Sequence, residues 1–157
     1  MEKDLINFDR EYFNTPLFGV GALIVSGSEI ALIRRAKEPS KGQWSIPGGL
    51  VNLGESLLDA VIREAYEETG LIVQPYCLVE ILERIIHDDA GSVKYHYILA
   101  DYLCEAKGGI LNAGSDASEA CWAPCDKLEL FDLSDFTFEV ISKGFNIHFE
   151  KSIAQSR

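Results

Sequence analysis

Apolar runs separated by short polar breaks divide the first part of the chain into strand-like segments. Leu17–Val25 is apolar with glycines at positions 19 and 21, which is typical of a buried central strand that another backbone approaches closely. Ser26–Ser28 is a turn signal, and Glu29–Arg35 has the composition of a second strand. We therefore expect these two segments to pair as a hairpin.

Further strand patterns follow in the second half of the chain. Cys77–His87 is expected to form a long strand, although its apolar spacing also fits a helix. Asp88–Gly91 is a turn signal, and Val93–Leu103 alternates well enough to be the next strand. Glu119–Pro124 is expected to be a short strand.

The C-terminal segment has helical spacing instead. In Asp135–Phe149, the side chains of Phe138, Ile141 and Phe145 fall on one face of an amphipathic helix. Gly144 in the same segment weakens this prediction, because glycine is a poor helix former.

A second predicted helix lies within the stretch from Gly49 to Leu71. Ser56 with Asp59 three residues later is a variant of the capping box that begins a helix, and Gly70 is typical of a helix C-terminus. At about 100° per residue, the apolar side chains gather on one face. These are Leu58, Val61, Ile62, Ala65 and Thr69.

Three glutamates lie on the opposite face of this helix. Glu64, Glu67 and Glu68 occupy positions i, i+3 and i+4, which are neighbours on a helix surface. Two carboxylates about 6 Å apart repel by roughly 3 kcal/mol at an effective dielectric constant of about 20. Water on an exposed helix reduces this cost to a few tenths of a kcal/mol, whereas in a cleft a divalent cation would relieve it. By itself the pattern fits a solvated acidic face or a metal site.

The composition is that of an ordinary globular protein with an excess of acids. The chain has 157 residues, of which 47% are apolar and 25% charged, and this favours one domain over residues 1–157. The net charge of −11 argues against a nucleic-acid polymer or an anionic membrane as the main partner. It does not exclude a small phosphorylated ligand, because a bound metal ion reverses the local sign of the charge.

The sequence shows neither a targeting signal nor a zinc motif. Its N-terminal residues carry scattered charges without an apolar core, and no apolar run is long enough to span a bilayer. The 4 cysteines lack the spacing and the neighbouring histidines of a zinc site. We therefore expect reduced thiols in a cytoplasmic protein.

The glutamate face belongs to a longer pattern. Gly49 is followed after five residues by Glu55, and after seven more by Arg63-Glu64-Ala65-x-Glu67-Glu68-x-Gly70-Leu71. This stretch resembles a complete Nudix box, the signature of the Nudix hydrolases. Its one departure is Ala65, where the pattern asks for a bulkier aliphatic residue, and this affects packing rather than chemistry. A match at every polar and glycine position is far more specific than a lone glycine motif.

The resemblance implies an α/β/α sandwich with a mixed β-sheet, in which the box forms a loop-helix-loop against one face. It also implies hydrolysis of a nucleoside diphosphate linked to another moiety, X, with Mg²⁺ or Mn²⁺ held by carboxylates. Such ions neutralise the diphosphate and lower the pKa of the attacking water. The alternative is a Nudix-like sensor that binds a nucleotide without cleaving it. Such a domain would be expected to lose glutamates from the box, and this chain has kept all of them.

The resemblance also assigns roles to single residues of the box. Glu67 and Glu68 are the expected principal metal ligands, with Glu64 as a further ligand. The backbone carbonyl of Gly49 can join the metal shell, and Glu55 is a supporting acid near the metal.

Two further residues complete the expected catalytic set. Arg63 is four residues before Glu67 and is expected to hold its carboxylate in place. Glu119 resembles the family's extra acid, which reaches the metal cluster from a loop outside the box. The acceptor for the proton of water is therefore either Glu64 or Glu119.

Candidate substrate-binding residues lie outside the box. Arg34 and Arg35 end a predicted strand where a phosphate could be met, but they fit a solvated surface equally well. Trp44, Tyr95 and Tyr97 are candidates for contacting a base or a sugar, although packing is the commoner role for such residues.

The sequence leaves X undecided within a MutT-like or ADP-ribose pyrophosphatase-like member of the family. The expected substrate is a small-molecule nucleotide: a nucleoside triphosphate, ADP-ribose or a nucleotide sugar. His87 stands where ADP-ribose-cleaving relatives tend to carry a proline. Homodimers are common in the family, and the sequence does not decide the oligomeric state.

Overall fold

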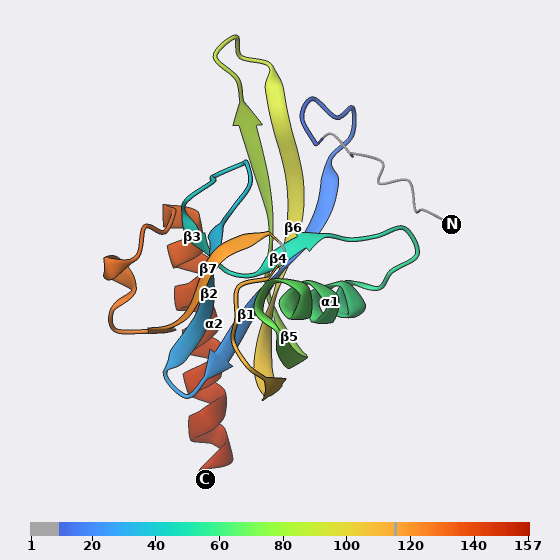
Figure 1. The fold of residues 1–157 in the computed structure, drawn as a ribbon. Coiled ribbons are helices and arrows are strands. Elements are labelled where there is room, and N and C mark those ends of the chain that lie inside the picture. The colour runs from blue at the N-terminus through green and yellow to red at the C-terminus, as the bar shows by residue number, and fades with distance from the viewer. Residues whose placement is uncertain (1–9, 115) are drawn as a thin grey trace.

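The fold is built on a mixed β-sheet with one helix packed on each face (Figure 1). The computed structural model describes residues 10–114 and 116–157. The strands are β1 (Leu17–Ser26), β2 (Glu29–Arg35), β3 (Trp44–Ser45), β4 (Gly48–Leu50), β5 (Leu71–His87), β6 (Val93–Gly109) and β7 (Ala117–Pro124). The helices are α1 (Leu57–Thr69) and α2 (Asp135–Gln155), and a short 3-10 turn spans Leu128–Leu130.

Strand β1 lies at the centre of the sheet, as its apolar sequence predicted. The order is β3-β2-β1-β6-β5, with β4 paired to β1 and β7 paired to β2. The pairing of β1 with β6 is parallel, while the other strand pairs are antiparallel. The predicted hairpin of β1 and β2 is therefore confirmed, and the sheet is mixed.

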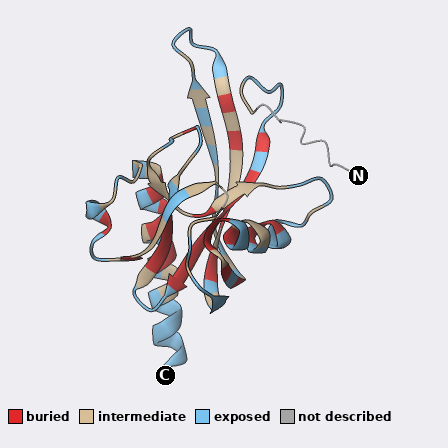
Figure 2. Cartoon of the chain, in the orientation of Figure 1, coloured by how far each residue is buried: buried red, intermediate tan, exposed pale blue. Residues whose placement is uncertain are grey.

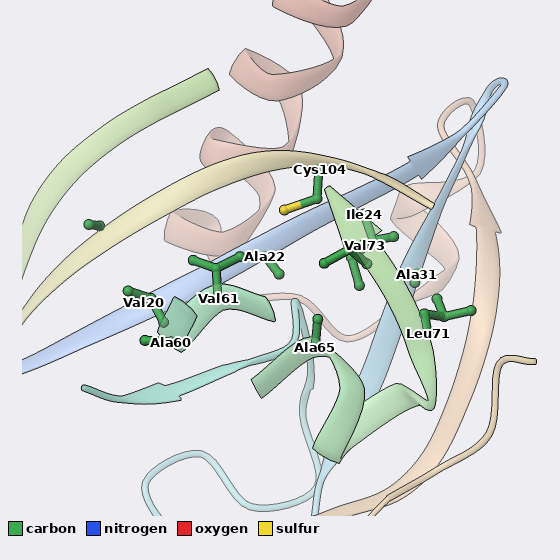
Figure 3. Close-up of a cluster of buried hydrophobic side chains, with 11 residues drawn as sticks. Val20, Ala22, Ile24, Ala31, Ala60, Val61, Ala65, Leu71, Val73 and Cys104 are labelled. Carbon is green, nitrogen blue, oxygen red and sulfur yellow. The ribbon is translucent and has the colours of Figure 1, made fainter. Parts of the chain in front are cut away.

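The continuous apolar run of β1 reflects burial on both of its sides. Alternate residues of a strand point to opposite faces of the sheet. Val20, Ala22 and Ile24 pack against the α1 side, where they meet Ala60, Val61 and Ala65 (Figure 3). The next residues in alternation, Leu23 and Val25, pack on the α2 side with Val140, Ile141 and Phe145. Two cores separated by one sheet give the expected α/β/α sandwich.

Strands β5 and β6 form a long hairpin that extends beyond the helices (Figure 1). The strand prediction for Cys77–His87 is confirmed, but β5 begins earlier, at Leu71, directly after α1. Asp88 shapes the turn, because its Oδ1 accepts hydrogen bonds from the backbone N–H groups of Ala90 and Ser92. The tip of the hairpin is exposed (Figure 2).

Helix α1 begins and ends where the sequence predicted, but its buried face differs from the prediction. Ser56 caps the helix by accepting a hydrogen bond from the N–H of Asp59, and Gly70 ends it in a left-handed conformation. Leu58 and Ile62 are exposed, although the helical wheel predicted them on the buried face. The helix instead packs on the sheet through small residues and through Glu68.

The buried face of α2 also differs from the prediction. The helix runs beyond Phe149 to Gln155, and Phe138 is exposed while Ile141 and Phe145 are buried. Gly144 lies directly on the side chain of Leu23, so that this position has no room for a side chain. The glycine is therefore a packing feature of α2 and not a helix breaker. No helix in the described ranges is long and apolar enough to cross a membrane.

Two glycines of the hairpin allow a test of how tightly α1 is fixed to the sheet. Gly91 in the turn and Gly109 at the end of β6 have φ angles of 84° and 83°. A methyl group on Gly91 would meet open space, whereas on Gly109 it would overlap the carbonyl oxygen of Gly70 at the end of α1. We expect Gly91→Ala to lower the free energy of unfolding by about 1–2 kcal/mol through backbone strain alone.

Gly109→Ala carries the same strain and also forces the backbone of Gly70 to move. We therefore expect it to lower the free energy of unfolding by about 1–3 kcal/mol more than Gly91→Ala does. Denaturation of both variants in guanidinium chloride measures the difference. Equal losses would contradict the tight contact between the ends of α1 and β6.

Candidate active site

A cavity of about 470 Å³ opens beside α1 and β4 and continues over β1 and β6 to the N-terminal end of α2. Its lining combines acidic residues of α1, arginines of β2 and β5, and tyrosines of β6. These are Glu64, Glu67, Glu68, Arg35, Arg84, Tyr95 and Tyr97. The fold thus brings the predicted glutamate face into a cleft and does not leave it in bulk solvent.

Glu68 is the most deeply buried acid of the box, with 6% of its surface exposed. Its Oε2 accepts a hydrogen bond of 2.9 Å from the backbone N–H of Gly48. Burial raises the pKa of this carboxyl to about 7, which the Gly48 hydrogen bond only partly opposes. An ionised Glu68 is therefore costly in the folded protein unless a cation joins it.

Glu64 lies against the glycine that opens the box. A Cβ atom on Gly49 would overlap the carboxyl group of Glu64, so glycine is needed for this close approach. Burial raises the pKa of Glu64, while the guanidinium of Arg63 acts in the opposite direction. Glu67 is more exposed than either of the other two carboxylates.

Arg63 is the centre of a hydrogen-bond network that joins the loop before α1 to the helix. Its Nε and Nη2 donate to the two oxygens of Glu55 at 2.6 and 2.9 Å, and Nη2 also donates to the carbonyl oxygen of Leu50. Its Nη1 donates to Glu64 at 2.6 Å and reaches Glu67 at 3.3 Å. The predicted contact with Glu67 exists, but the paired bond to Glu55 is the stronger geometry.

The residues of this face fit a divalent metal by their chemistry. Glu64, Glu67 and Glu68 supply carboxylate oxygens, the donors that Mg²⁺ and Mn²⁺ prefer. Within residues 10–114 and 116–157, no three acidic, histidine or cysteine side chains already converge as a metal cluster. Arg63 donates to one oxygen of Glu64 and to one oxygen of Glu67, so the second oxygen of each carboxylate is left to bind a metal.

An arginine wall, formed by Arg10, Arg35 and Arg84, also lines the cavity. All three guanidinium groups lie close enough to Tyr97 to oppose the rise in its pKa that burial causes. Burial, and secondly Arg35, lowers the pKa of Arg84. In the described part of the chain, neither Arg35 nor Arg84 forms an ion pair, and their hydrogen bonds go to Pro39 and Ser40. Arg35 does act electrostatically on Glu68, but an anionic ligand would still meet two guanidinium groups that are not held in a direct ion pair.

Five of the predicted site residues are absent from the cavity lining: Glu55 and Arg63, which form the network described above, and Arg34, Trp44 and Glu119. Arg34 pairs with Glu119 on β7 at 2.9 Å, and both side chains are exposed. Trp44 packs edge-on against Phe131, with ring centroids 5.5 Å apart. The structure thus brings Arg35, Tyr95 and Tyr97 to the cavity but not Arg34, Trp44 or Glu119.

The structure adds an acid that the sequence did not single out. Asp116, on the loop before β7, lines the cavity and acts electrostatically on Glu68. Its Oδ1 forms an ion pair with Nζ of Lys37 at 2.6 Å. The loop is held to the box, because the N–H of Gly114 donates to the carbonyl oxygen of Glu68. In the sequence, Asp116 is only an acidic residue in a short polar loop, and this pattern is too common to identify a functional residue.

Known proteins with similar sequences and folds show the family of this chain. The model of the NUDIX domain matches residues 15–143 of the chain. The chain is 37% identical over 135 residues to the ADP-ribose pyrophosphatase of Methanocaldococcus jannaschii, and the match covers 83% of this chain and 73% of that protein. It is 31% identical over 100 residues to the mouse 8-oxo-dGDP phosphatase NUDT18, over 61% of this chain but 28% of that protein.

Among solved structures, a MutT NUDIX hydrolase from Burkholderia pseudomallei superposes with a TM-score of 0.72 at 30% identity. That match covers 83% of this chain and 98% of the other. The chain belongs to the Nudix family and is a Nudix-type pyrophosphohydrolase. Enzymes of this family act on small nucleotides and use divalent metal ions.

The Glu55–Arg63 pair gives a prediction about stability and pH. The hydrogen bonds from Arg63 lower the pKa of Glu55 from 4.5 to about 2. A carboxyl with a lowered pKa in the folded state stabilises the protein above its unfolded pKa and loses this effect as the pH falls. We expect Glu55→Gln to be less stable than the wild type at pH 7, and the difference to shrink as the pH falls from about 4.5 towards 2.

Urea denaturation of both proteins over this pH range measures the difference. Glu150→Gln, at an exposed position of α2, is the control and is expected to stay within about 0.5 kcal/mol of the wild type. A deficit of Glu55→Gln that does not change with pH would show that the ion pair is not its cause.

Proposed function

We propose that this protein hydrolyses the diphosphate linkage of a nucleoside diphosphate joined to a moiety X, with Mg²⁺ as its metal and Mn²⁺ as a substitute. Water would add to one phosphorus atom as the bridging P–O bond breaks, giving a nucleotide and phosphorylated X. The observation that carries this proposal is the cavity itself, where α1 carboxylates and the arginine wall line one space. A metal-bound diphosphate needs both kinds of group.

The roles of the α1 residues follow from their positions. Glu67 and Glu68 would be the principal metal ligands, with Glu64 as a further ligand. A bound divalent ion would neutralise the diphosphate and make water a better nucleophile. Arg63 would fix the direction of Glu64 and Glu67, and Glu55 would fix Arg63.

Glu64 is the better candidate for the acceptor of the proton of water. It lines the cavity, and burial raises its pKa, which makes it a stronger base. Glu119 is exposed, paired with Arg34 and absent from the cavity lining. Asp116, which lines the cavity, would be the acid that reaches the site from a loop outside the box, the role expected of Glu119.

The substrate would be a nucleotide whose phosphoryl oxygens meet the arginine wall. The names of two relatives, an ADP-ribose pyrophosphatase and an 8-oxo-dGDP phosphatase, both describe compounds that contain a nucleoside diphosphate. A screen for Mg²⁺-dependent turnover of nucleoside triphosphates, 8-oxo-dGDP, ADP-ribose and nucleotide sugars would identify X. Release of a nucleotide from none of these compounds would overturn the proposal.

Substitution of Glu68 tests the metal assignment. Glutamine keeps the shape and can still accept the hydrogen bond from Gly48, but it removes the charge that would hold the metal. We expect Glu68→Gln to lower kcat/KM by more than the roughly 10- to 100-fold that is typical of losing a residue that only supports a metal ligand. The folded protein should be at least as stable as the wild type at pH 8, because a buried charge is removed.

Glu119→Gln is the matched control and should keep its activity within a few-fold. Steady-state kinetics measures the activity of both variants, and the rise in unfolding temperature on adding Mg²⁺ measures metal binding. This rise should be lost in Glu68→Gln and kept in Glu119→Gln. Loss of activity in Glu119→Gln with full activity in Glu68→Gln would reverse the assignment.

The arginine wall gives a second test of the proposed function. We expect Arg84→Gln to raise KM by about 10-fold or more, because a hydrogen bond to a charged group contributes about 1.5–3 kcal/mol. Arg34→Gln removes a guanidinium group outside the cavity, and KM should change by less than about twofold, because the exposed ion pair of Arg34 contributes little. Equal effects of both substitutions would point to the overall charge of the protein and not to the wall.

A further inference from the structure

A buried acid lines the cavity from the sheet rather than from α1. Asp101 lies on β6, where it is the register partner of Gly21 on β1. It is only 2% exposed, and it belongs to the cavity lining. None of the roles assigned above uses this residue.

Asp101 has no partner in the described part of the chain. Neither a hydrogen bond nor an ion pair reaches its carboxyl group within residues 10–114 and 116–157. Its cross-strand neighbour Glu80 is paired with Lys143 of α2 at 2.7 Å, so that the lysine is not available to Asp101. Burial, and secondly Glu80, raises the pKa of Asp101 to about 7. A buried acid without a partner destabilises a fold, which indicates that its partner is a ligand.

The surroundings of Asp101 suit a flat ring. A Cβ atom on Gly21 would overlap both the Asp101 carboxyl group and the side chain of Ile46, so glycine leaves the carboxyl group room to lie over β1. Phe136 and Val140 of α2 line the same cavity. Apolar side chains with one polar group among them are typical of a site that binds an aromatic heterocycle and fixes its orientation.

We propose that Asp101 recognises the base of the nucleotide by accepting two hydrogen bonds from a guanine-type edge. An ionised carboxylate offers two acceptor oxygens and no donor. The N1–H and N2–H groups of guanine are two donors side by side, which match this pair of oxygens. Adenine, cytosine and uracil do not present two adjacent ring and amino donors of this kind. This inference rests on the proposed function, because it takes the ligand to be a nucleotide.

Binding of nucleoside monophosphates tests the inference without any need for turnover. GMP and IMP differ by the 2-amino group alone, and this group would be one of the two donors to Asp101. We expect the wild-type protein to bind GMP at least about 10-fold more tightly than IMP in calorimetry, since a hydrogen bond to a charged group commonly has an effect of this size. AMP is expected to bind at least as weakly as IMP.

The variant Asp101→Asn supplies the second measurement. Its amide would place a donor against the donors of guanine, so the variant should bind GMP and IMP with about equal affinity. Thermal unfolding should occur at the same or a higher temperature, because an unpartnered buried acid is removed. Glu105→Gln is the matched control, since Glu105 lies on the same strand, outside the cavity, in an exposed pair with Lys107. It should keep the preference of the wild type.

The outcomes separate this inference from the proposed function. Equal affinity of the wild type for GMP and IMP would overturn the role of Asp101, even if Asp101→Asn failed to fold. A loss of affinity on going from GMP to dGMP, with no loss from GMP to IMP, would also overturn it, because the carboxylate would then bind the ribose. Preference for GMP without hydrolysis of any diphosphate would support Asp101 and overturn the proposed function. Hydrolysis of a diphosphate without any preference among bases would support the proposed function and overturn the role of Asp101.

Discussion

The site depends on the guanidinium group of Arg63, which donates hydrogen bonds to three different segments of the chain. Arg63 donates to both oxygens of Glu55 in the loop before α1 and to Glu64 on the helix. It also donates to the carbonyl oxygen of Leu50 at the end of β4. A loop, a strand and a helix are thus fixed by a planar group whose donors have set directions. The orientation of the carboxylates then follows from this group and from the glycine at position 49, which leaves Glu64 its space.

The cavity contains charged side chains that destabilise the folded protein when no ligand is bound. Glu68 and Asp101 are buried acids whose pKa values are both raised to about 7. Arg84 is a partly buried cation beside Arg35, and no acid of the described chain is paired with either. Each of these groups lowers the stability of the folded protein, and each would be compensated by a different part of a metal-bound nucleotide. This is the expected trade between stability and function at a binding site.

The sequence predicted the elements of this fold well where local physics decides them. The strands were recognised by apolar runs and turns, and the ends of α1 by the caps at Ser56 and Gly70. It was wrong about the faces of the two helices, where Leu58 and Phe138 are exposed. An apolar pattern shows that a helix has a buried face, but the sheet it packs on decides which residues that face includes. Gly144 is explained only by its contact with Leu23 of β1.

The sequence alone determined the family and the reaction, because both reside in the box and its spacing on a single loop and helix. The environment of each group was decided by the tertiary structure. Glu68 became a buried acid through its contact with β4, and Glu119 stayed exposed because it faces Arg34 across the pairing of β2 and β7. Asp116 and Asp101 entered the cavity from a loop and a strand distant in sequence from the box. Burial and charge at such positions depend on contacts between segments that no local pattern records.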